Sequence, residues 1–222
     1  MMPKTEPFEI YSDAYDEWFE KNPEPFGAEL ETLRRLIPRP QADGMEVGVG
    51  SGQFAAPLGI KTGVEPSRQM AIRAKKRGIR VYAGVAEALP FFSGKFEFVL
   101  MVTVICFVDD AAQSFREAYR VLKPGGFLVV GFIDKESILG AQYAQNREKS
   151  RFYKDATFFS AQEVMYFFEE AGFNDLNALQ TLIPGELPGA ICEGVGRGAF
   201  VAIRGSKTSC IPEDASNPLV RR

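Results

Sequence analysis

Residues 44–67 read GMEVGVGSGQFAAPLGIKTGVEPS, a glycine-rich loop between two short strand candidates, 45–49 and 61–65. The three glycines of the loop stand at every second position, at Gly48, Gly50 and Gly52. Glycines let the backbone approach a ligand closely, and a helix that follows such a loop offers free N–H groups. Glu65 ends the second strand, and its carboxylate can accept hydrogen bonds from both hydroxyls of a ribose. The stretch therefore predicts a nucleotide site.

The spacing inside this stretch narrows the type of nucleotide. A dinucleotide fingerprint requires GxGxxG, and Gln53 stands where its third glycine belongs, so an NAD site fits poorly. About ten residues separate Gly52 from the second strand, near the lower limit for a parallel crossover. Pro57 lies inside that interval and is unfavourable within a longer helix. We therefore predict a first helix of barely two turns, over 53–58.

Strands and helices alternate along the rest of the chain, which indicates a doubly wound α/β sheet with its ligand at the carboxyl ends of the strands. Helices are predicted after Ser67 (to about Arg77, with Gly78 as the stop), after Asp109 or Asp110, and after a Ser160/Glu163 capping box. The predicted later strands are 79–84, 96–108, 127–133, 177–183 and 198–204, with KPGG (123–126) as a turn.

Two further segments border the expected site. Residues 1–40 predict a helical lid, in which Ser12 caps a helix with an aromatic face of Tyr11, Tyr15, Trp18 and Phe19. Residues 134–159 form a long polar and aromatic segment after the fifth strand. Residues 206–222 have no apolar periodicity and predict a loose tail after a single domain of 1–205.

Composition excludes several classes of protein. The net charge is −3 and the pI about 5.3, and we expect the one dense basic run, 73–77, to be a solvated helix end, so neither nucleic acid nor an anionic membrane is an expected partner. No apolar run is long enough to span a bilayer. The three scattered cysteines predict reduced thiols in the cytoplasm. Since histidine is absent, no metal site is expected.

Four motifs occur in order over about 44–133: EVGVGSG, GVEPSRQM, GVAEALPF and REAYRVLKPGGFLVV. Together they resemble the class I S-adenosylmethionine-dependent methyltransferases, in particular the type-11 group that includes the ubiquinone/menaquinone-biosynthesis methylases. The resemblance implies a Rossmann-like, mostly parallel sheet of seven strands whose last strand is antiparallel. GRGAFVAIRG (196–205) is the candidate for that strand.

The resemblance also implies S-adenosylmethionine as the cofactor. Glu46 and the glycine loop would line its methionine end, and Glu65 would bind its ribose. The implied cofactor-binding residues are Tyr15, Trp18, Glu46, Gly48, Val49, Gly50, Ser51, Gly52, Glu65, Pro66, Met70, Val85, Ala86, Glu87, Val102 and Thr103. Many relatives carry Asp at the position of Val85, and valine cannot accept from the adenine amino group. That contact must come from Glu87 or a backbone carbonyl, or be absent.

The segment 134–159 would form the acceptor side of the site. The candidate acceptor-binding residues are Cys106, Tyr143, Arg147 and Tyr153. If Arg147 and Arg151 both point inward, a carboxylate- or phosphate-bearing acceptor follows; if outward, they are solvated. Methyl transfer requires no particular side chain, so the sequence identifies no catalytic residue. Without histidine, any base would be Asp, Glu, Tyr or water.

The leading prediction is in-line methyl transfer to a small-molecule acceptor by a monomer or homodimer. The second is a methyltransferase of RNA or protein, against which the acidic pI argues. The third is a non-catalytic protein that binds S-adenosylmethionine in a regulatory role. An NAD-dependent enzyme is a more distant alternative.

Overall fold

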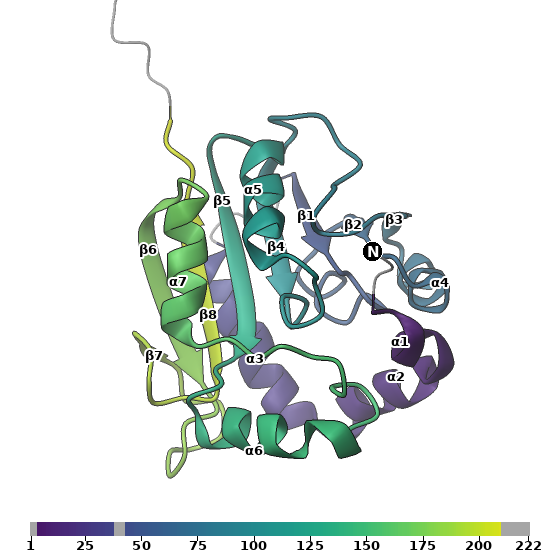
Figure 1. Cartoon of the computed structure of the whole chain (residues 1–222), viewed down its shortest axis with the longest axis vertical. Coiled ribbons are helices and arrows are strands. Elements are labelled where there is room, and N and C mark those ends of the chain that lie inside the picture. The colour runs from purple at the N-terminus through teal and green to yellow at the C-terminus, as the bar shows by residue number, and fades with distance from the viewer. Residues whose placement is uncertain (1–3, 38–42, 210–222) are drawn as a thin grey trace, which may run out of the picture.

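The computed structural model describes residues 4–37 and 43–209 as helices packed on both faces of one central sheet (Figure 1). The strands are β1 (Gly44–Val47), β2 (Thr62–Val64), β3 (Arg80–Tyr82), β4 (Phe96–Val102), β5 (Leu122–Ile133), β6 (Asn174–Thr181), β7 (Cys192–Glu193) and β8 (Phe200–Ser206). The helices are α1 (Glu6–Ile10), α2 (Ser12–Lys21), α3 (Pro23–Leu36), α4 (Arg68–Lys76), α5 (Ala111–Val121), α6 (Ile138–Asn146) and α7 (Ala161–Glu170), with a 3-10 turn, η1, at Arg147–Lys149.

The sheet has the order β3-β2-β1-β4-β5-β8-β6-β7. Strands β1 to β5 pair in parallel, and β8 lies antiparallel between β5 and β6, which confirms the predicted topology. The predicted number of seven strands is wrong by one. The eighth, β7, has two residues and pairs with β6 at the sheet edge, where Leu179 faces Glu193. Two residues are too short a segment to show a period-2 pattern.

Two apolar layers cover the sheet. Figure 1 shows α5 and α7 in front of it and α3 behind it. Phe115 of α5 and Phe168 of α7 pack at the front, and Leu33 of α3 packs at the back against Phe200 of β8. The central strand β4 is buried over nearly its whole length, as its apolar sequence predicts for a parallel strand covered on both faces.

Helix caps follow the sequence closely after β2. The Ser67 side chain accepts from the Met70 amide, Asp110 accepts from Gln113, and Ser160 and Glu163 form the predicted capping box. Ser12 does not cap a helix, because it lies inside α2, whose N-cap is Tyr11 without a side-chain hydrogen bond.

The predicted helix over 53–58 is absent, and the chain runs through consecutive turns instead. The amide of Ala56 donates to the Gly52 carbonyl and that of Leu58 to the Phe54 carbonyl. Between them stands Pro57, which has no N–H to donate, so two consecutive helical hydrogen bonds cannot form. The KPGG segment also differs from its prediction, since it belongs to the start of β5, where the pairing with β4 is irregular.

The chain remains fixed to the fold beyond β8. The Lys207 amide donates to the Gly126 carbonyl, and its ammonium donates to the carbonyls of Tyr119 and Leu122. Of the predicted tail 206–222, residues 210–222, including Cys210, lie outside the described part of the chain. Within 4–37 and 43–209, no helix is both long and apolar enough to cross a membrane.

Candidate functional site

A cavity of about 660 Å³ lies at the carboxyl edge of the sheet. Val47, Val64 and Val102 are the last residues of β1, β2 and β4, and all three line it. Figure 1 shows α1 and α2 beside this edge and α6 crossing it. The cavity therefore occupies the place where doubly wound sheets bind their ligands.

Glu65 projects from the turn after β2 into the base of the cavity. Its Oε2 accepts from the Gly50 amide at 2.8 Å, and its Oε1 accepts from the Ser67 amide at 2.8 Å. Each carboxylate oxygen keeps a second lone pair for a ligand hydroxyl. Burial raises the pKa of Glu65 to about 7, although the two backbone donors act to lower it. The geometry suits a ligand that offers two neighbouring hydroxyls.

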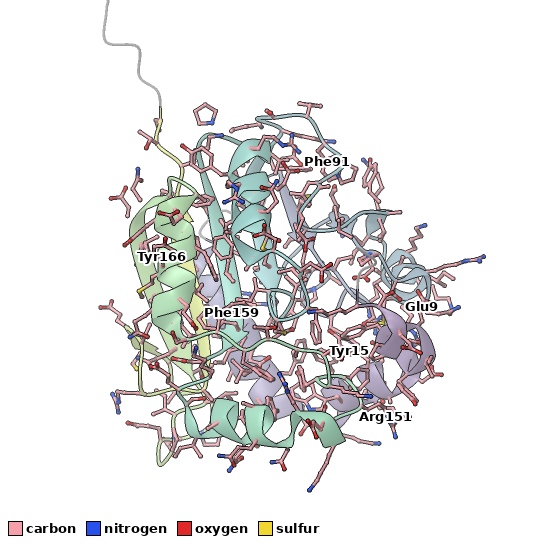
Figure 2. All side chains as sticks on the ribbon, viewed as in Figure 1. Glu9, Tyr15, Phe91, Arg151, Phe159 and Tyr166 are labelled. Atoms are coloured by element: carbon pink, nitrogen blue, oxygen red, sulfur yellow. The ribbon has the colours of Figure 1, made fainter. Side chains whose placement is uncertain are left out.

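The glycine loop comes close to the N-terminal helices at Gly50. Its φ of +54° is a left-handed conformation that favours glycine. A Cβ there would lie 3.4 Å from the Tyr15 hydroxyl and 3.5 Å from the Met70 methyl carbon. Figure 2 places Tyr15 on the side of α2 that faces the sheet. The loop, Tyr15 and Met70 thus form one narrow end of the cavity.

Glu46 lies beneath this loop and is 2% exposed. Its Oε2 has no hydrogen-bond partner among the described residues. Burial raises the pKa of Glu46 well above its usual value. Glu46 does not line the cavity itself, so it could act on a ligand only indirectly, by supporting the loop.

Asp16 of α2 fastens the N-terminal helices to the loop. It accepts hydrogen bonds from Ser51, from Gln53 at 2.9 Å and from Arg73 at 3.0 Å, and it forms an ion pair with Arg77 at 3.3 Å. Burial would raise the pKa of Asp16, but these donors hold it below its usual value. The basic run 73–77 is therefore not simply a solvated helix end, because two of its arginines bind Asp16 of α2.

Tyr15 also belongs to a group of aromatic rings, from three segments, that line the cavity next to the narrow end at Gly50. Phe8 of α1 lies 5.0 Å from Phe107 and 5.6 Å from Phe152, and Tyr15 lies 6.1 Å from Phe152. Tyr143 stacks on Tyr153 with a centroid distance of 5.2 Å. All of these rings line the cavity, so contacts of α1 and α2 with the segment after β5 form part of its wall.

Thr103 adds a strained backbone to the cavity wall. It follows β4 with a φ of +50°, which is unusual for a β-branched residue, and its amide donates to the Gly131 carbonyl at 2.8 Å. Strain of this kind concentrates at ligand sites. On the same side of the site, Glu87 accepts from the Asp109 amide at 2.7 Å, which positions the start of α5.

The structure brings most of the predicted site residues together. Those that line the cavity are Tyr15, Trp18, Gly48, Gly50, Glu65, Pro66, Met70, Val85, Ala86, Glu87, Val102, Thr103, Tyr143 and Tyr153. Those that do not are Glu46, Val49, Ser51, Gly52, Cys106 and Arg147.

The second group has other contacts or faces solvent. Val49 belongs to the apolar layer behind the sheet, and a Cβ on Gly52 would meet Ile79 at 2.5 Å. The Cys106 thiol donates to the Thr103 carbonyl, and burial raises its pKa to about 12. Arg147 and Arg151 are exposed, and the Arg151 guanidinium lies 4.7 Å from the Tyr11 ring. Neither arginine supports an anionic acceptor.

Glu29 of α3 also lines the cavity, and it is not among the predicted site residues. It is 6% exposed, and burial raises its pKa to about 8. Its signal was present in the sequence, since it stands four residues before Leu33 and seven before Leu36 on the apolar stripe of its helix. A carboxylate on such a stripe requires an explanation.

Comparison with known proteins shows that the chain is similar to methyltransferases. A methyltransferase-domain family model matches residues 45–130. A solved structure from Thermotoga maritima, described as an S-adenosylmethionine-dependent methyltransferase and "possible histamine N-methyltransferase", is 47% identical with a TM-score of 0.87, covering 92% of this chain and 100% of that one.

Two curated proteins are also similar. An uncharacterized protein of Methanocaldococcus jannaschii is 43% identical over 204 residues, 90% of this chain and 98% of its own. A ubiquinone/menaquinone biosynthesis C-methyltransferase of Desulfotalea psychrophila is 32% identical over 162 residues, 60% of this chain and 66% of its own.

Proposed function

Since this chain belongs to the class I S-adenosylmethionine-dependent methyltransferases, we propose that it methylates a small organic molecule held in the aromatic end of the cavity. The main support for this proposal is that the rings of Phe8, Tyr15 and Phe152 cover part of the cavity. A covered cavity admits a small acceptor more readily than a polymer. In this proposal 1–205 is one domain, with 1–40 as its lid and 134–159 as its acceptor side.

The residues at the narrow end fit the cofactor. Glu65 keeps free lone pairs for ribose hydroxyls, Gly50 allows close approach, and the cavity of about 660 Å³ is within the size range of cofactor sites. When bound, S-adenosylmethionine supplies an electrophilic methyl group on a sulfonium. The chain's own residues hold the acceptor in line and exclude water, which is most of what this displacement requires.

The names of the similar proteins support a small acceptor. One is described as a possible histamine N-methyltransferase and another as a C-methyltransferase of ubiquinone/menaquinone biosynthesis. A pI of about 5.3 argues against nucleic acid. We further propose that the enzyme acts in the cytoplasm as a monomer or homodimer.

Calorimetry with S-adenosylmethionine, followed by release of S-adenosylhomocysteine across an acceptor panel, tests the proposal. The panel contains small amines, phenols and quinols beside tRNA and a mixed peptide pool. Turnover on a small molecule supports the proposed function. Turnover confined to tRNA or peptide contradicts the proposed function and supports a methyltransferase of RNA or protein instead.

Tyr15→Ala is expected to weaken S-adenosylmethionine binding roughly tenfold, because it removes a ring that lies next to Gly50 and would attract the sulfonium of the cofactor. Calorimetry measures the effect. Tyr15→Phe keeps the ring and should retain most of the affinity. Unchanged affinity and turnover in Tyr15→Ala would show that this face of α2 is merely structural.

Cofactor affinity is expected to fall as the pH drops below about 7, the pKa to which burial raises Glu65. Ribose hydroxyls donate to the ionised carboxylate, so bound cofactor lowers this pKa and affinity is fully present only above the ligand-free value. The loss approaches tenfold per pH unit, as one pKa unit equals about 1.4 kcal/mol. Titrations between pH 5.5 and 8 measure it, and equal affinity across that range would contradict the role of Glu65.

A further inference from the structure

Glu29 is a buried carboxyl group of α3 that lines the cavity. It is 6% exposed and shares the inward stripe of α3 with Thr32, Leu33 and Leu36, all of which are buried. Burying a carboxylate among apolar groups is unfavourable unless a partner compensates its charge. The position is therefore unexpected for a residue that only has to pack.

No partner for Glu29 occurs among residues 4–37 and 43–209. None of them forms a hydrogen bond or ion pair with its carboxylate, and burial alone shifts its pKa. Of the described residues that line the cavity, Lys4 alone is cationic, and its charge acts on the Cys106 thiol. Glu29 thus holds a proton near neutral pH, and the protein leaves its ionised form for a cationic ligand to compensate.

Three tyrosines line the cavity together with Glu29, and none supplies a positive charge. Tyr15, Tyr143 and Tyr153 lie close enough that the charge of Glu29 adds to the burial that raises their pKa values. Their hydroxyls therefore stay protonated at neutral pH, and their rings offer π faces. Aromatic faces beside a carboxylate attract an organic cation and disfavour an anion.

The geometry points to Glu29 as the specificity-determining residue of the acceptor site, where it pairs with a cationic nitrogen of an amine whose apolar body lies among the tyrosine rings. This inference rests on the proposed function, because it assigns the proposed acceptor to the part of the cavity that Glu29 and the tyrosine rings line. It also accounts for the exposed Arg147 and Arg151, since an amine needs no guanidinium partner.

The test compares matched acceptors on the full-length protein saturated with S-adenosylhomocysteine. Alkyl-, phenylalkyl- and imidazolylalkyl-amines are titrated calorimetrically beside alcohols of the same carbon frame. Glu29→Gln keeps the shape and removes the charge. Glu24→Gln is the control, because it removes a carboxylate from an exposed position of the same helix, outside the cavity. S-adenosylmethionine affinity and melting temperature are measured on each variant.

Wild-type protein should bind at least one amine and prefer it to its alcohol, and Glu29→Gln should lose roughly 100-fold in affinity for that amine. Glu24→Gln should leave the amine affinity unchanged, and Glu29→Gln should bind S-adenosylmethionine normally. Amine binding should also release a proton from Glu29 in the wild type, since burial keeps its pKa near 8, and not in Glu29→Gln.

Equal affinity for amine and alcohol, or no amine binding at all, overturns the inference on wild-type protein alone. Unchanged amine affinity in Glu29→Gln also overturns it. Methyl transfer to neutral acceptors only would leave the proposed function standing while removing this inference. Absence of S-adenosylmethionine binding in the wild type would instead contradict the proposed function itself.

Discussion

Replacing Glu65 by glutamine is expected to weaken S-adenosylmethionine binding roughly 100-fold, or by about 3 kcal/mol. The carboxylate would accept charge-assisted hydrogen bonds from the ribose, and it already accepts from the amides of Gly50 and Ser67. A glutamine side chain turns one of these oxygens into a donor, which then faces a backbone N–H. The variant therefore has two defects: it loses a hydrogen bond to the ribose, and it holds the glycine loop less firmly. Calorimetry measures the affinity.

Glu97→Gln is the matched control for this experiment. Glu97 also accepts from a backbone amide, that of Asp43 at 3.0 Å, but it lies at the start of β4, away from the cavity. Its replacement should cost stability without changing cofactor affinity. If both variants bind S-adenosylmethionine alike, Glu65 does not hold the ribose. Glu65→Gln should also abolish the pH dependence of binding between pH 5.5 and 8.

Features that depend on neighbouring residues could be predicted from the sequence. The Ser160/Glu163 box and the Ser67 cap act over three residues, and both were predicted correctly. The position of Glu65 between a strand and a helix cap predicts a ligand-binding carboxylate, and the structure places Glu65 in the cavity. The antiparallel last strand was predicted from the resemblance rather than from the residues alone.

Features that depend on distant partners could not be predicted. Asp16 and Arg73 are 57 residues apart, and no local pattern couples them. Glu29 was visible on an apolar stripe, but only the structure shows that the stripe reaches a cavity. The helix at 53–58 failed for a different reason, because Pro57 removes the single N–H that would have joined two helical turns.

Gly48→Ala is expected to lower the free energy of unfolding by about 3 kcal/mol, the sum of a left-handed backbone penalty and overpacking. Gly48 has a φ of +64°, and a Cβ there would lie 2.3 Å from Val104 Cγ2 and 2.9 Å from Val104 Cβ. Val104 is branched at Cβ, so a rotamer change cannot clear both atoms. Urea denaturation measures the loss. Since Gly48 and Val104 both line the cavity, cofactor affinity should fall as well.

Gly94→Ala separates the two causes. Gly94 has a similar φ of +70°, but a Cβ there would meet nothing within 4 Å, so this variant should show the backbone penalty alone, about 1 kcal/mol. Gly48→Ala combined with Val104→Ala should recover part of the stability, because it removes the closer of the two clashing atoms. Equal destabilisation by Gly48→Ala and Gly94→Ala would mean that the loop shifts to accept a side chain. In that case the contact with Val104 would not fix the position of the glycine loop.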